Sequence, residues 1–184
     1  MRNTKVIKLC FLKYHPDEPF MNRLTCYISK HKVFHVELGF DDNIFFSIMQ
    51  DTHASLRKRR LENPNYEFYN IQVTPQQYYK CLELCRYIAE KQVTFDDWGL
   101  YLVFVSKFIS CYRENQDIEN IRSTFCSKII TQILQQIDLE EVQHLRPECT
   151  SPSDLLEAVR GSSRSVIDSV RIHKKNSHLV PNFN

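Results

Sequence analysis

The sequence predicts an α+β domain in which an antiparallel sheet from the N-terminal half packs against helices from the C-terminal half. Segments with the two-residue alternation of strands fill most of residues 5–73, and segments with helical periodicity follow from residue 74. Strands first and helices afterwards are typical of α+β folds. With 184 residues, the chain is long enough for one domain with its own core.

The expected strands are rich in aromatic and β-branched residues and are separated by turn residues. They cover residues 5–14, 24–29 (a short one), 33–40, 44–49 and 66–73. Asp41-Asp42-Asn43 predicts a tight turn that joins two of these strands into a hairpin. Residues 51–64 are polar and are predicted to form a loop.

Helix start signals then appear. Thr74-Pro75-Gln76-Gln77 is a capping box with proline at the first helical position, and it opens a helix to about Lys91. The second helical segment starts at Phe95-Asp96-Asp97-Trp98 and continues to Tyr112. A third helix covers about 124–137, with Ser123 or Thr124 as its N-cap. Ser151-Pro152-Ser153-Asp154 caps a last helix over 155–160.

Beyond this helix the composition changes. Residues 161–184 are mostly Ser, Arg, Lys, His and Asn, with few large apolar side chains. We therefore expect one domain over residues 1–160 and a polar, mobile tail over residues 161–184.

Composition excludes several functional classes. A net charge of only +2 gives no overall field that would point to obligate nucleic-acid binding. Three glycines leave no Gly-rich phosphate loop, which argues against the usual nucleotide-binding folds. The first residues lack a signal-peptide pattern, and no apolar run is long enough for a transmembrane segment. The expected localisation is cytoplasmic.

The seven cysteines are scattered and odd in number, which favours reduced thiols in a cytosolic or nuclear compartment. Cys81 and Cys85 stand four residues apart on a predicted helix and could share a metal ion. No second Cys/His pair with matching spacing follows, so buried small side chains are the preferred interpretation. We expect no metal and no organic cofactor.

Cys126 is the strongest candidate for a reactive side chain. It lies in the first turn of the helix over 124–137, where the positive end of the helix dipole favours thiolate. The alternative is a buried helix cysteine without chemistry. A nucleophilic thiolate also requires a base nearby.

Among the seven histidines, only His35 lies in the middle of a clearly predicted strand. Alternation puts Val33, His35, Glu37 and Gly39 on one face, opposite a wholly apolar face. If the helix that carries Cys126 packs on the first of these faces, imidazole and thiol meet. The group that orients the imidazole is then Glu37 or Ser47, with Gln50 a weaker option. The alternative is a half-buried strand histidine with a solvent contact.

Four sequence blocks resemble one known family in their order along the chain. They are Phe34-His35-Val36-Glu37-Leu38 with the hairpin to Ser47, then Phe95-Asp96-Asp97-Trp98-Gly99-Leu100, Phe125-Cys126-Ser127-Lys128-Ile129-Ile130 and Ser151-Pro152-Ser153-Asp154-Leu155-Leu156. This pattern resembles the circularly permuted papain-like thiol hydrolases of the NlpC type. It is closest to the YiiX-like branch, which has poxvirus members and is related to the lecithin retinol acyltransferase group.

The resemblance implies a permuted papain-like fold, in which the histidine precedes the cysteine. It implies Cys126 as nucleophile and His35 as base. Glu37 ranks above Ser47 as the third residue, because many members carry His-x-Glu. It further implies hydrolysis or acyl transfer at a peptide-type amide or an acyl-lipid ester, without a cofactor. The composition and the missing signal segment suit an intracellular protein or a viral protein. A viral protein would be located in the host cell.

Two other functional interpretations remain open at the level of sequence. The first is a binding or scaffold protein that keeps the fold but not the chemistry. The second is contact with nucleic acid or an anionic membrane through the basic run Arg57, Lys58, Arg59, Arg60, together with Arg171, Lys174 and Lys175. The apolar stretch 100–105 is either core or a surface offered to acyl chains.

Overall fold

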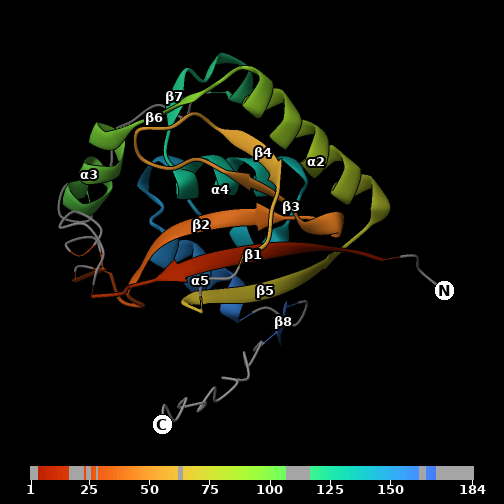
Figure 1. Ribbon diagram of the computed structural model, residues 1–184, viewed down its shortest axis with the longest axis horizontal. Coiled ribbons are helices and arrows are strands. Elements are labelled where there is room, and N and C mark those ends of the chain that lie inside the picture. Colours follow the sequence, from red (N-terminus) through yellow and green to blue (C-terminus); the bar gives the residue numbers. More distant parts are fainter. Residues whose placement is uncertain are drawn as a thin grey trace, which may run out of the picture.

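The computed structural model describes residues 4–16, 23, 26–27, 29–61, 64–106, 117–161 and 165–168. Within them the chain has an α+β fold with a six-stranded antiparallel sheet, in the order β4-β3-β2-β1-β5-β8 (Figure 1). The strands are β1 (Lys5–Lys13), β2 (Val33–Gly39), β3 (Ile44–Ser47), β4 (Ser55–Lys58), β5 (Tyr66–Val73) and β8 (Ser165–Asp168). The short strands β6 (Thr94–Phe95) and β7 (Ser123–Thr124) form a separate parallel pair.

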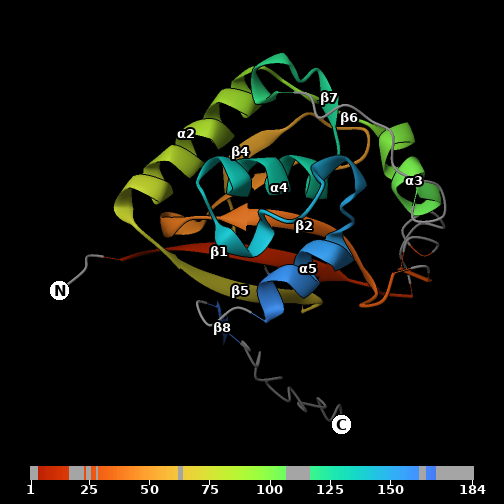
Figure 2. The same ribbon diagram turned by 180° about the vertical axis from the view of Figure 1, so that it is seen from behind.

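Helices cover one face of the sheet. The covering helices are α2 (Pro75–Glu90), α4 (Cys126–Gln136) and α5 (Pro152–Arg160), while α3 (Asp97–Ser106) lies beside the end of the sheet. Short 3-10 turns are η1 (Asp41–Asn43), η2 (Ile118–Asn120), η3 (Glu140–Val142) and η4 (Pro147–Cys149). Figure 2 shows α4 and α5 in front of β2, β1 and β5, with α2 running along the side of β4. The predicted class, an antiparallel sheet packed against helices, is confirmed.

Apolar side chains divide into two clusters. The large cluster lies between the sheet and the helices, where Val36 and Leu38 of β2 meet Ile129, Ile130 and Ile133 of α4. The small cluster contains Leu12, Cys26 and Phe34, with Tyr14 and Tyr66 packed against it. The helix-covered face therefore supplies most of the hydrophobic stabilisation.

Capping and turn predictions are confirmed. Thr74 and Gln77 form the capping box of α2, and Ser151 and Asp154 form that of α5. Asp42 and Asn43 adopt left-handed φ values of 60° and 58°, which Asp and Asn tolerate better than most residues. They close the hairpin between β2 and β3.

Three predictions about strands and the tail are wrong. Residues 24–29 do not form a strand where they are described, because Cys26 and Tyr27 are helical. A strand there would have no free edge on β1, which already pairs with β2 and β5. Ser55–Lys58, predicted as loop, pairs with β3, and Ser165–Asp168 of the predicted tail pairs with β5. The rest of the tail and the predicted helical residues 107–112 lie outside the described residues.

The cysteine prediction also needs correction. Cys10, Cys26, Cys81, Cys85 and Cys126 are free, but Cys149 is disulfide-bonded, so the expectation of reduced thiols fails at that residue. That expectation rests on the odd number and scattered spacing of the cysteines and on the missing signal-peptide pattern, and none of these observations reveals which cysteines the fold brings together. Cys111 lies outside the described residues. None of the described helices is both long and apolar enough to cross a membrane.

Candidate functional site

A bulge in β2 sets the direction of its side chains. Leu12 of β1 lies opposite His35, and the next residue, Lys13, lies opposite Val33, so Phe34 is the extra residue. Val33 consequently joins the main core and Phe34 joins the small cluster with Leu12. The prediction that Val33 shares the face of His35 is wrong for this reason. Glu37 remains on that face, two residues beyond His35.

His35 contacts both predicted orienting residues. Its Nε2 lies 3.1 Å from Glu37 Oε1 and 3.5 Å from Ser47 Oγ. The His35 side chain is 5% exposed and that of Glu37 is fully buried. Gln50, the third option, lies in the exposed turn after β3. The shorter contact and the negative charge make Glu37 the stronger partner of the imidazole.

Three donors surround the buried Glu37 carboxylate. Tyr66 Oη donates to Oε1 at 2.8 Å, Arg59 donates to Oε2, and His35 contacts Oε1. Burial alone would raise the pKa of Glu37, but the hydrogen bond and the charge of His35, with those of Arg59, lower it to about 2. Glu37 is therefore ionised at neutral pH inside the protein.

Arg59 and Tyr66 were not anticipated as parts of the site. Arg59 belongs to the predicted basic run, yet it forms an ion pair with Glu37 and is not a free surface cation. Its guanidinium lies 6.0 Å from the centre of the Phe45 ring. A Cβ on Gly39 would lie only 2.8 Å from that ring, so glycine allows Phe45 to lie across β2. Tyr66 pairs in register with Leu12, which in turn pairs with His35.

Cys126 is the first residue of α4. The residue before the helix is Phe125, and no side chain caps it. The predicted caps Ser123 and Thr124 instead form β7, which pairs with β6 and holds both in extended conformation. Ser127 Oγ donates to the Thr150 carbonyl at 2.7 Å and ties the start of α4 to the segment before α5. The first backbone N–H groups of α4 are thus left without a capping side chain.

The Cys126 thiol lies close enough to the His35 imidazole to influence its protonation. Burial alone would lower the pKa of His35, but the hydrogen bonds to Cys126 and Glu37 and their charges raise it to about 9. β3 pairs with β2 only at Phe46 and Phe45, so β2 has no partner from β3 alongside His35. The start of α4 meets the imidazole there. The structure brings Cys126, His35, Glu37 and Ser47 together.

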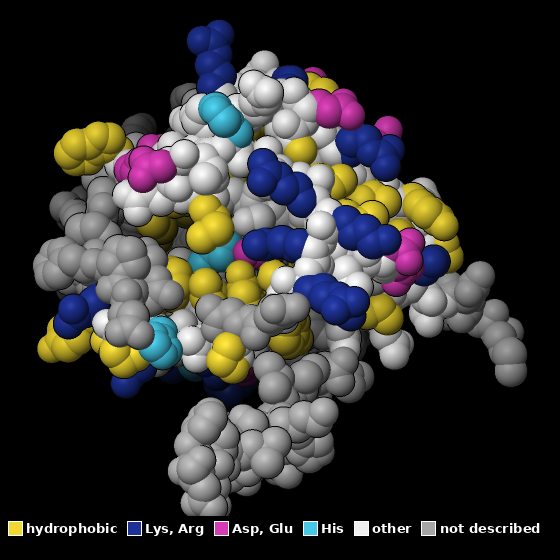
Figure 3. All heavy atoms as spheres, viewed as in Figure 1, with side chains coloured by type: hydrophobic (Ala, Val, Ile, Leu, Met, Phe, Trp, Pro, Cys, Tyr) yellow, Lys and Arg dark blue, Asp and Glu magenta, His cyan; other side chains and the backbone are white. Residues whose placement is uncertain are grey.

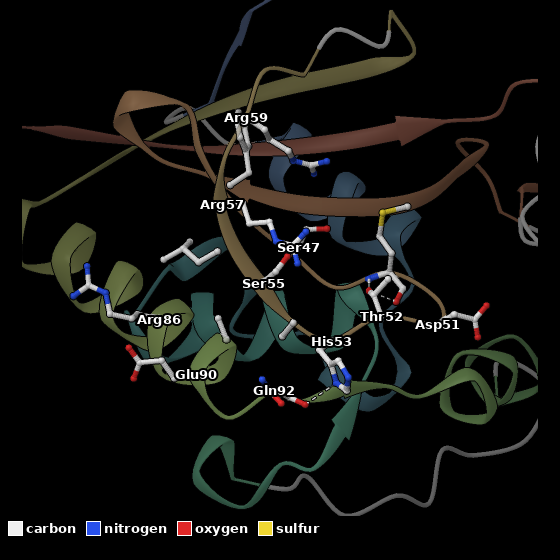
Figure 4. A pocket seen from close by; sticks show the side chains of 15 residues that line it. Ser47, Asp51, Thr52, His53, Ser55, Arg57, Arg59, Arg86, Glu90 and Gln92 are labelled. Carbon is white, nitrogen blue, oxygen red and sulfur yellow. Dashed lines mark hydrogen bonds between the residues drawn. The ribbon is translucent and has the colours of Figure 1, made fainter.

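A hollow of about 820 Å³ reaches this cluster from β4. Ser47 and Arg59 line it, together with Arg57, Ser55 and the C-terminal part of α2 (Figure 4). In Figure 3, Lys and Arg side chains lie to the right of a central depression, hydrophobic side chains lie to its left and below it, and His and acidic side chains are visible at its base. Ser47 connects the hollow to His35, because its hydroxyl touches both.

Cys81 and Cys85 play no part in this site. Both are buried in the main core, and burial together with the neighbouring Cys81 thiol raises the pKa of Cys85. Among the described residues, no group of three or more His, Cys, Asp or Glu side chains has a geometry suited to a metal ion.

No family model, curated protein or solved structure matches this chain. Its function is therefore inferred from the chemistry of its side chains.

Proposed function

We propose that the protein is a cysteine-nucleophile hydrolase or acyltransferase that acts on an amide or ester bond of a peptide or acyl-lipid substrate. Cys126 is the nucleophile, His35 the general base and acid, and Glu37 the residue that orients and charges His35. The single observation that carries this proposal is the buried chain of contacts from the Cys126 thiol through His35 to Glu37.

The two ring nitrogens of His35 have different partners in this mechanism. Nε2 faces Glu37 Oε1, and we assign the other nitrogen, Nδ1, to the thiol of Cys126. His35 takes the thiol proton, and the thiolate attacks the carbonyl carbon to give a tetrahedral oxyanion. The imidazolium returns the proton to the leaving nitrogen or oxygen as its bond to carbon breaks. Water, or an acceptor amine or alcohol, then attacks the thioester while His35 removes its proton.

The oxyanion needs donors close to Cys126. The backbone N–H groups in the first turn of α4 face no capping side chain and lie beside the nucleophile. They are the natural donors for the negative oxygen, and the helix dipole adds to their effect. We assign the backbone N–H of Cys126 as the first of these donors.

We also propose that the fold is the permuted papain-like fold of NlpC-type hydrolases. The strand with His35 precedes the helix with Cys126, and that helix packs against this strand. The third residue, Glu37, lies on the histidine strand itself. These features support the resemblance seen in the sequence, without a matched relative.

Selective alkylation tests the proposal. Cys10, Cys26, Cys81 and Cys85 are as buried as Cys126, so exposure alone gives Cys126 no advantage. We expect sub-stoichiometric iodoacetamide at neutral pH to label Cys126 first, and we expect His35→Ala to remove this preference. The matched control is Cys81→Ala, which should leave labelling of Cys126 unchanged.

Activity provides the second part of this test. A screen of peptide amides and acyl esters should find a substrate whose turnover is lost in Cys126→Ala and retained in Cys81→Ala. Turnover that persists in Cys126→Ala would remove the thiol from the mechanism.

The 1% exposure of Cys126 also supports a second candidate, a binding or scaffold protein with a closed site. An inert Cys126 in the alkylation experiment would favour that interpretation.

A further inference from the structure

Strand register places three more polar residues on the face of His35 and Glu37. Gly39 of β2 lies opposite Phe45 of β3, and Phe45 lies opposite Arg57 of β4. Cross-strand partners point to the same side of a sheet. Arg57 therefore shares the face of Gly39, which is also that of Glu37.

Ser47 and Ser55 belong to the same face. They lie opposite each other, two residues along β3 and β4 from Phe45 and Arg57. Figure 4 shows the Arg57 side chain extending toward Ser47 and Ser55, along the hollow that reaches His35. Two hydroxyl groups and one guanidinium thus gather beside the proposed nucleophile.

Arg57 lies in β4 and Arg59 follows the end of that strand, and the two arginines differ in their partners. Arg59 is engaged by the Glu37 carboxylate. Arg57 is exposed, and in the described part of the chain it forms no ion pair. Asp51 and Glu90 also line the hollow, but Figure 4 shows them at its opposite ends, away from Arg57. The centre of the hollow therefore carries an uncompensated positive charge.

We propose that Arg57, with Ser47 and Ser55, binds an oxyanion of the substrate. The guanidinium offers paired N–H donors to two oxygens of a carboxylate or phosphate, and the hydroxyl groups add further donors. This inference rests on the proposed function, because the subsite adjoins the Cys126–His35 pair. The substrate class is then an acyl compound with an acidic group several bonds from its carbonyl carbon.

Strand geometry indicates how far the acidic group of the substrate lies from its reacting carbonyl carbon. The Cα atoms of Arg57 and His35 are separated by two strand spacings and four residues, which is roughly 16 Å. The Arg57 side chain extends back toward Ser47, and Ser47 Oγ is 3.5 Å from the imidazole. An anion at this subsite and a carbonyl at Cys126 consequently belong to one small molecule or to neighbouring groups of one chain.

Lys58 is the matched control. It follows Arg57 directly, is also exposed, and lies opposite Ile44 on the other face of β4. Arg57→Gln and Lys58→Gln remove the same charge from nearly the same place. A non-specific electrostatic attraction would respond to both changes, whereas the subsite responds only to the first.

The test is calorimetric titration of the full-length Cys126→Ala protein with inorganic phosphate and, separately, with succinate. At least one anion should bind, with affinity at least ten-fold weaker after the added change Arg57→Gln and unchanged after Lys58→Gln. The tighter anion identifies the acidic group as phosphate or carboxylate. Absence of binding by both anions, or equal weakening by both changes, would overturn the subsite.

Two further measurements separate possible failures. Arg57→Lys keeps the charge but loses the paired donors, so several-fold weaker binding is expected even if Arg57→Gln does not fold. Because the nucleophile is absent in these proteins, anion binding is measured independently of catalysis. Cys126 labelling and turnover of a neutral acyl substrate test the proposed function, and an active enzyme that binds neither anion would refute only the subsite.

Discussion

The two faces of β2 are both buried, but their side chains are stabilised in different ways. On the helix-covered face, Val36 and Leu38 pack among apolar side chains of α4. On the other face, His35 and Glu37 form specific contacts with Cys126, Arg59 and other donors. Apolar packing tolerates substitution by residues of similar volume, whereas a buried carboxylate requires every one of its partners. Changes on the polar face should therefore affect both stability and reactivity, and changes on the apolar face only stability.

Among substitutions on the two faces of β2, Glu37→Ala should have the largest effect on stability and on the reactivity of Cys126. It leaves Arg59, Tyr66 and His35 without their common partner, and breaking a buried ion pair in this way costs about 3–5 kcal/mol of unfolding free energy. Urea unfolding measures this loss, and alkylation of Cys126 should slow in the same protein. A stability close to that of the wild type would mean that the cluster is not the tightly paired group described above.

Leu38→Ala examines the apolar face at the neighbouring position. Leu38 is fully buried, and removal of a buried leucine side chain typically costs about 2–5 kcal/mol. We expect urea unfolding to show this loss of unfolding free energy, while the pH dependence of Cys126 alkylation stays unchanged. A shifted pH profile would show that the two faces are coupled through the strand.

Glu37→Gln should change protonation more than stability, since the amide keeps the size of the carboxylate. The Glu37 charge helps raise the pKa of His35 to about 9, so its removal should lower that pKa. The alkaline limb of turnover, where the imidazolium is lost as general acid, then moves to lower pH. NMR titration of the His35 ring measures the shift directly. An unchanged His35 pKa would remove Glu37 from its orienting role.

The same pKa shifts predict how stability depends on pH. The pKa of Glu37 is lowered from 4.5 to about 2, so its contribution is present above pH 4.5 and is lost as the pH falls toward 2. The pKa of His35 is raised from 6.5 to about 9, so its contribution is complete below pH 6.5 and is lost as the pH rises through 9. Urea midpoints should be highest between about pH 4.5 and 6.5. In Glu37→Gln, the acidic decline should be weaker.

Ser47→Ala should have the smallest effect. Its hydroxyl lies 3.5 Å from His35 Nε2, beyond the length of a strong hydrogen bond. We expect at most about 1 kcal/mol of lost stability. The rate of Cys126 alkylation should change only a few-fold. If Ser47→Ala slowed Cys126 alkylation as much as Glu37→Gln does, Ser47 and not Glu37 would be the residue that orients His35.

Much of this fold follows from local signals in the sequence. The alternating pattern of β1, β2 and β5 and the capping boxes of α2 and α5 are properties of neighbouring residues, and these five elements are present as predicted. By contrast, β4 has the pattern Ser-Leu-Arg-Lys, in which only Leu56 is apolar, so nothing distinguishes this edge strand from a polar loop. β8 likewise becomes a strand only because β5 offers it an edge.

The candidate site was predictable in part. A cysteine at a helix start and a His-x-Glu pair on a strand are visible in the sequence, and Cys126, His35 and Glu37 do lie together. Arg59 could not be separated from the neighbouring basic residues, because its contact with Glu37 depends on how β4 aligns with β3 and how β3 aligns with β2. Ser123 and Thr124 have the chemistry of N-caps, yet pairing with β6 takes precedence over capping.

The bulge at Phe34 makes the length of β2 adjustable at one point. Deletion of Phe34 would leave Val33 and His35 adjacent, with their side chains still on opposite faces and still opposite Lys13 and Leu12. Deletion of Val36 would instead reverse every side chain on one side of the gap. Homologous chains can therefore gain or lose one residue before the histidine without moving it, and a motif that counts residues from the start of this strand would fail to find them.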